Sequence, residues 1–250
     1  VVLFFILTTS RALLQAGLTL LFLSWHWGVD GVLLATVLVA LLQAAILLAM
    51  QTRAQGLLLN LKQVKKYLSY SLPVAGSGLL AFMLMGFDRW ALAHMSTLEQ
   101  VAIYGVAAKL ALATVFLAQP FGMWWLPRRF SVLQQENGAG KVAGCIALGI
   151  TVVMIIAVFI CYLTPLLIRY LLPDPYQHIL GYICALVLAM TFKEIAELVN
   201  IGCFSGHSTR GQLVVNLIST ALGTGVMLLS IPYLAIWGVI LALNLAYLSK

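Results

Sequence analysis

Charged side chains inside otherwise apolar stretches are the residues of this sequence best suited to chemistry. Asp88, Arg89 and Lys109 lie in two apolar stretches separated by a short polar segment at 96–99. A charge at the centre of a membrane helix costs on the order of 2.5–3.5 kcal/mol, so it usually faces a water-filled cavity or a charged partner. An Arg guanidinium binds phosphate through paired hydrogen bonds. The pattern predicts a phosphate-attracting cavity wall formed by Arg89 and Lys109, with Asp88 as charge partner.

The two stretches are expected to form a helical hairpin around 96–99. Counted from that turn at roughly 1.5 Å per residue, Asp88 and Lys109 differ in depth by only about 5 Å. An alternative is that Asp88 pairs with Lys109 or Arg89 and merely fixes the hairpin, or that Arg89 extends to the membrane surface.

A second group of charges lies at Lys193, Glu194 and Glu197, with Asn200 beyond them. Lys193, Glu197 and Asn200 follow i, i+4, i+7 and share one helix face. Pairing of Lys193 with Glu197 would lower the cost of holding both in a membrane. One interpretation is a neutralised structural stripe. The other is that Lys193 adds to the cationic substrate site and a carboxylate binds H⁺ or Na⁺ and couples it to transport.

Histidine and cysteine residues show no pattern of a metal or catalytic site. The histidines fall in or beside expected loops and form no HExxH motif, and the cysteines lie in or at the edge of apolar runs without ligand spacing. We therefore expect no catalytic residue, no metal and no cofactor. These residues are His26, His94, His178, His207, Cys145, Cys161, Cys184 and Cys203.

The elements that carry these charges are predicted to be membrane-spanning helices. Apolar residues make up 63% of the chain and charged residues only 8%, whereas a soluble domain carries roughly 25% charged residues. About 20 apolar residues span a bilayer as a helix, and about eight stretches qualify. The predicted fold is thus an all-α integral membrane bundle. The expected spans are 2–25, 31–50, 72–93, 101–120, 142–165, 179–203, 212–230 and 234–249.

The Lys and Arg residues between the spans predict the orientation of the chain. Every second connection is basic, whereas the others have almost no Lys or Arg; Arg169 is the exception and is offset by Asp174. Short basic loops stay in the cytoplasm, so both ends of the chain are expected there. The net charge of +7 is scattered among these loops rather than clustered, which argues against a nucleic-acid partner. The basic loop residues are Arg53, Lys62, Lys65, Lys66, Arg128, Arg129, Lys141 and Arg210.

The polar segment 51–70 is the expected boundary between two helical lobes, and it suits an amphipathic helix on the inner leaflet. Residues 1–50 would be the last two helices of a truncated N-terminal lobe, and 71–250 a six-helix C-terminal lobe. An internal repeat supports this division, because GVDGVLLA at 28–35 resembles IWGVILA at 236–242, although chance similarity is an alternative. The chain is expected to be a fragment that is inactive alone.

Several motifs resemble those of a known transporter family. They are YLSYSLP at 67–73, DRWALAH at 88–94 with VAIYGVAAKL at 101–110, WLP at 125–127, and the repeat at 28–35 and 236–242. Together they resemble the polysaccharide-transport (Wzx-like O-antigen flippase) branch of the multidrug/oligosaccharidyl-lipid/polysaccharide exporter superfamily. The family has no fixed pattern that matches Lys193, Glu194 and Glu197.

This resemblance implies two six-helix lobes around a central cavity that opens alternately to either side of a bacterial inner membrane. It implies a lipid-linked (undecaprenyl-diphosphate) oligosaccharide as cargo for surface polysaccharide such as lipopolysaccharide, and other polysaccharide-assembly proteins as partners. Asp88, Arg89 and Lys109 would face the cavity.

Three alternatives belong to other classes. A multidrug exporter of the same superfamily is disfavoured because a cationic cavity repels cationic drugs. A membrane polysaccharide polymerase, ligase or acyltransferase is disfavoured because the expected external connections are short. A passive assembly subunit would gain little from charges within its spans.

Overall fold

The chain is all-helical, as the sequence predicts, over the part that the structure describes. The computed structural model describes residues 2–56, 61–171, 179–204 and 210–250, and these ranges contain no strands. Within these ranges, six helices are long and apolar enough to cross a membrane, which gives the chain the character of a multi-pass membrane protein. These are α1 (Val2–Ser24), α2 (Gly28–Gln55), α3 (Leu61–Met95), α4 (Leu98–Trp125), α6 (Gly138–Leu171) and α9 (Arg210–Leu234).

The other described helices differ from the expected spans. The predicted sixth span is α7 (Leu180–Val199), which carries three charged residues, followed by the single turn α8 (Ile201–Phe204). The predicted eighth span is α10 (Ile236–Leu248), whose 13 residues reach roughly 20 Å. That is shorter than a hydrocarbon core of about 30 Å. Between α4 and α6 lies the short α5 (Arg129–Leu133).

The chain divides into two compact units, Val1–Val64 and Lys65–Lys250, and each is considered by itself. The division falls within the predicted linker 51–70, but this segment contains no separate surface helix in its described part. Instead, α2 continues to Gln55 and α3 already begins at Leu61. The helices extend past the apolar stretches because Lys, Gln and Arg also favour helix outside the bilayer.

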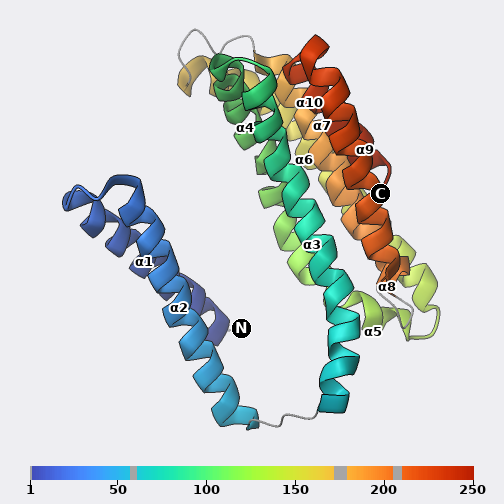
Figure 1. Cartoon of the computed structure of the whole chain (residues 1–250). Helices are drawn as coiled ribbons and strands as arrows, with labels where there is room; N and C mark the ends of the chain where they lie inside the picture. The colour runs from blue at the N-terminus through green and yellow to red at the C-terminus, as the bar shows by residue number, and fades with distance from the viewer. Residues whose placement is uncertain (1, 57–60, 172–178, 205–209) are drawn as a thin grey trace. The chain divides into compact units, whose positions relative to one another are not determined.

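In the first unit, α1 and α2 form an antiparallel hairpin (Figure 1). Gln15 Nε2 donates a hydrogen bond to Thr36 Oγ1 at 3.3 Å, and Phe22 stacks on Trp27 with ring centroids 5.2 Å apart. Apolar side chains such as Leu13 point outward, which is the arrangement expected of helices that face lipid.

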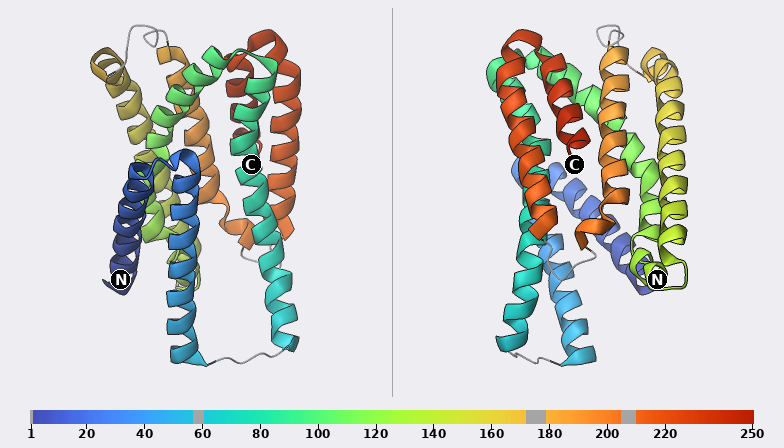
Figure 2. Two further views of the ribbon diagram at one scale, coloured as in Figure 1. Left: turned by 60° about the vertical axis from the view of Figure 1, so that its left-hand side comes forward. Right: turned by 90° about the vertical axis from the view of Figure 1, so that its right-hand side faces the viewer.

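In the second unit, the long helices run side by side as a bundle (Figure 2). Its core forms around α7, which packs against α4, α6 and α10, while α10 also packs along α9. Buried residues of α7 such as Ile183, Leu186 and Met190 belong to this core. α3 contacts α9 through the hydrogen bond from Asn216 to Ser77. This bundle holds every candidate site residue.

At two glycines, each at the turn of a helix hairpin, the two helices come so close together that there is no room for a Cβ atom. A Cβ on Gly238 would lie 2.7 Å from the backbone carbon of Ser230, at the turn from α9 into α10. A Cβ on Gly31 would lie 2.8 Å from Phe22 Cβ, at the turn from α1 into α2. The repeated sequence pattern thus marks the same physical requirement in both hairpins.

Candidate functional site

The α3–α4 hairpin turns where the sequence predicts it. Thr97 caps α4, and its side-chain oxygen accepts a hydrogen bond from the backbone N–H of Gln100 at 3.3 Å. The hairpin brings Asp88, Arg89 and Lys109 to the lining of one small pocket of about 70 Å³, together with residues of α7 and α10. The depth argument from the sequence therefore agrees with the placement of these three residues.

Asp88 is held by a tyrosine rather than by a cation. Its side chain is buried, with 6% of the residue exposed. The Tyr104 hydroxyl donates to Oδ2 at 2.5 Å, and the Arg89 backbone N–H donates to Oδ1 at 2.6 Å. Within the described residues, neither Arg89 nor Lys109 forms an ion pair with Asp88, so the structural ion pair considered from the sequence is wrong. The hydroxyl of Tyr104 satisfies the Asp88 carboxylate in place of a cation.

Arg89 and Lys109 are both exposed on the bundle. Across the described ranges, no carboxylate lies within ion-pair distance of either side chain. The pocket beside them is small, at about 70 Å³. The exposed cationic groups of Arg89 and Lys109 are available to a larger ligand such as a diphosphate.

The charges on α7 pair differently from the sequence prediction. Lys193 Nζ contacts Glu194 Oε1 at 3.0 Å, and both side chains are about four-fifths buried. The predicted Lys193–Glu197 pair is wrong, because Glu197 instead accepts a hydrogen bond from Asn200 Nδ2 at 2.9 Å. Lys193 and Glu194 therefore neutralise each other, and Glu197 is the carboxylate of this group that takes part in a separate network.

That network extends to Arg129, which the sequence indicated only as a loop cation. Arg129 is 7% exposed, and its Nη1 donates to Asn200 Oδ1 at 2.7 Å. Burial lowers the pKa of Arg129 from its ordinary value, and the charge of Glu197 opposes this shift. Asn200 thus links α5 to the C-terminal end of α7. A basic residue directly after an apolar run gave no signal that it would be buried.

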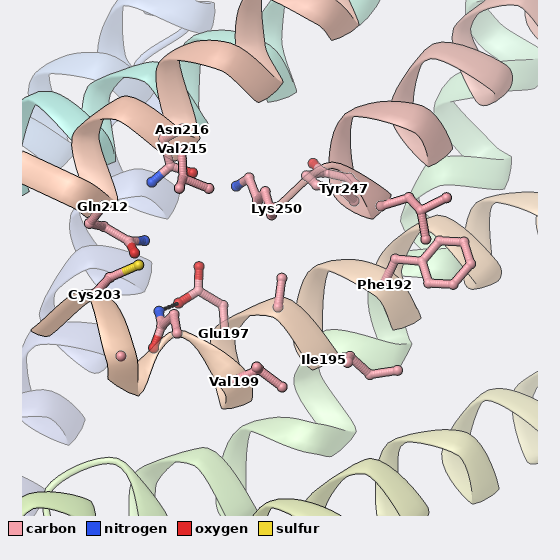
Figure 3. Close-up of a pocket in the computed structure, with 14 residues that line it drawn as sticks. Phe192, Ile195, Glu197, Val199, Cys203, Gln212, Val215, Asn216, Tyr247 and Lys250 are labelled. Atoms are coloured by element: carbon pink, nitrogen blue, oxygen red, sulfur yellow. Dashed lines mark hydrogen bonds between the residues drawn. The ribbon is translucent and has the colours of Figure 1, made fainter. Parts of the chain in front are cut away.

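A larger pocket of about 350 Å³ opens next to this network, between α7, α8, α9 and α10. Figure 3 shows Glu197 of α7 below the open space and Asn216 of α9 above it, with Gln212 on the left and Phe192 on the right. Gln212 and Asn216 were missed in the sequence. Their i, i+4 spacing within an apolar stretch, continued by Thr220, was the available signal of a polar helix face.

Among the described residues, no group of His, Cys, Asp or Glu could hold a metal ion. His94 lies inside α3, where its ring contacts the Trp90 carbonyl at 3.0 Å. All four cysteines are half-buried and unbridged. Asp174, His178 and His207 lie outside the described residues.

The comparisons with known proteins give no relative. No protein-family model, no curated protein and no solved structure matches the chain. The function is therefore argued from the geometry of the charged residues and from the sequence motifs.

Proposed function

We propose that this chain is part of a transporter of the bacterial inner membrane that flips an undecaprenyl-diphosphate-linked oligosaccharide by alternating access. The supporting observation is the pair of exposed cations Arg89 and Lys109, which form no ion pair within the described residues of the α3–α4 hairpin. Cations within apolar spans attract phosphate, while the lipid tail of the cargo stays in the bilayer. No bond is made or broken, so the chain is a transporter rather than an enzyme.

The state of the carboxylates favours this proposal over a multidrug exporter. Export of organic cations needs a carboxylate that is free to face the drug. Asp88 accepts two hydrogen bonds, and Glu194 is paired with Lys193. Glu197 borders a pocket, but Lys250 on the same lining opposes the binding of an organic cation there. Glu197 is the candidate for H⁺ or Na⁺ coupling. Expression of the gene should accordingly give cells no protection from cationic dyes.

Charge reversal tests the proposed function. Arg89→Glu and Lys109→Glu, made together in the gene of the source cell, should abolish surface polysaccharide because the diphosphate then meets like charge. The measurement is the amount of surface polysaccharide, with membrane levels of the protein checked by immunoblot. Lys141→Glu is the matched control, since Lys141 is exposed and lies outside the hairpin. Full surface polysaccharide in the double variant would contradict the proposal.

A further inference from the structure

The pocket between α7, α8, α9 and α10 has a polar side and an aromatic end. Glu197 of α7 lines it together with Gln212 and Asn216 of α9 and Lys250, while Phe192 and Tyr247 contribute aromatic rings (Figure 3). Asn200, which follows α7, also lines the pocket. Its volume of about 350 Å³ lies in the range of small-molecule sites. The polar groups are mostly carboxamides, each of which can both donate and accept hydrogen bonds.

Asn216 shows that this polar side is not satisfied by the protein alone. The residue is 4% exposed. Its Nδ2 donates to Ser77 Oγ, but its buried Oδ1 has no hydrogen-bond partner within the described residues. Leaving such a group unpaired costs about 1–3 kcal/mol. That oxygen is itself enclosed, but the carboxamide of Gln212, 9% exposed on the pocket lining, forms no hydrogen bond within the described residues, so a ligand with hydroxyl groups would satisfy Gln212.

We propose that this pocket binds one uncharged hexopyranose unit of the cargo, a role that rests on the proposed function. A pyranose ring has a rim of hydroxyl groups and two faces of C–H groups. The hydroxyls would donate to Glu197 and exchange hydrogen bonds with the carboxamide of Gln212. The C–H face would pack on the ring of Phe192. Arg89 and Lys109 would hold the diphosphate separately.

Other ligands fit the pocket less well. An acyl chain would leave the carboxamide of Gln212 and the second carboxylate oxygen of Glu197 unpaired, at the cost that burial of unpaired polar groups imposes. An anionic sugar would face the carboxylate of Glu197. An organic cation would meet the positive charge of Lys250, which shares the lining with Glu197. A neutral ligand rich in hydroxyls satisfies Gln212 and Glu197 without adding a charge.

Saturation-transfer difference NMR on the purified full protein tests this site directly. The protein is placed in phospholipid nanodiscs, since many detergents carry sugar headgroups. The probes are glucose, galactose, mannose, rhamnose, N-acetylglucosamine and N-acetylgalactosamine. We expect transfer to the ring protons of at least one probe above that of empty nanodiscs.

Two variants and one control locate the binding. Gln212→Ala removes a polar contact, and Cys203→Trp fills the pocket while all its carboxamides are kept; each should reduce the transfer at least fivefold. Gln134→Ala is the matched control, because Gln134 is exposed on the loop after α5 and its loss should change nothing. Circular dichroism and gel filtration confirm that each variant is folded.

The outcomes separate this proposal from the proposed function. Absence of transfer to all six sugars, or equal transfer in both pocket variants, overturns the sugar site even if charge reversal at Arg89 and Lys109 abolishes export. Transfer that depends on Gln212 supports the sugar site even if charge reversal leaves export intact, in which case the flippase proposal alone fails.

Discussion

At the scale of single residues, the bond between Tyr104 and Asp88 determines how the charges of α3 and α4 are used. The hydroxyl and the Arg89 amide satisfy the buried carboxylate. Because Asp88 does not need a cation, Arg89 and Lys109 can remain exposed. A hydroxyl donor thus keeps an acidic residue inside the bundle and leaves the cations available for phosphate.

This arrangement predicts that Tyr104→Phe destabilises the protein. The change leaves the buried Asp88 carboxylate without its side-chain donor, at a cost of about 1–3 kcal/mol. The measurement is the melting temperature of the purified protein, followed by intrinsic fluorescence. Tyr162→Phe is the matched control, since Tyr162 is 80% exposed on α6. Equal melting temperatures for the two variants would show that the Tyr104 bond contributes nothing.

The pairing of individual charges was only partly predictable. Helical spacing placed Lys193, Glu197 and Asn200 on one face, and Glu197 does bond to Asn200. Spacing does not determine which of two neighbouring carboxylates a flexible Lys side chain reaches, and Lys193 pairs with Glu194. The burial of Arg129 depends on a contact between segments far apart in the sequence, Arg129 and Asn200. No local pattern encodes such a contact.

At the scale of helices, the turn between α9 and α10 depends on the missing side chain of Gly238. We predict that Gly238→Ala lowers the yield of folded protein and its melting temperature, because the new Cβ would meet backbone atoms of Ser230 and Ile231 at 2.7–2.8 Å. Backbone atoms cannot move aside as a side chain can. The measurement is the monodisperse fraction in gel filtration together with the melting temperature.

Gly225→Ala is the control for this change, because nothing lies within 4 Å of its Cβ position. In a helix, Ala is favoured over Gly by up to about 1 kcal/mol, so this variant should be as stable as the wild type or more stable. If Gly238→Ala behaves in the same way, the turn does not require glycine.

The helices themselves followed from the sequence more closely than the side-chain contacts did. Apolar length predicted the long helices, and the polar residues at 96–99 predicted the α3–α4 turn. The separate surface helix at 51–70 was wrong because residues from Leu61 onward continue into α3 without a break. α10 is shorter than the apolar run 234–249 because α9 continues to Leu234 and takes up the start of that run. The apolar run alone does not show where α9 ends.

At the scale of the whole molecule, the number of membrane crossings decides which pockets open to which side. In the part of the chain that the structure describes, six helices meet the length and composition of a span, whereas the basic connections predict that α7 and α10 also cross. The Lys193–Glu194 pair lowers the cost of placing α7 in the bilayer, since neutralised charges there are better tolerated. If α7 crosses, Gly211 at the start of α9 lies in the cytoplasm beside Arg210.

Labelling of single cysteines with a membrane-impermeant maleimide in intact cells measures this topology. With the four native cysteines replaced by serine, Ser96→Cys and Tyr233→Cys should react from outside. Gly211→Cys should react only after permeabilisation, because α7 has returned the chain to the cytoplasm. If α7 does not cross, the two sites that follow it exchange sides: Gly211→Cys is labelled in intact cells and Tyr233→Cys is protected, while Ser96→Cys is unchanged. Ser96→Cys therefore serves as the internal control. An exchange of labelling between Gly211→Cys and Tyr233→Cys would place the pocket beside Glu197 away from the cytoplasmic side, where the cargo is made.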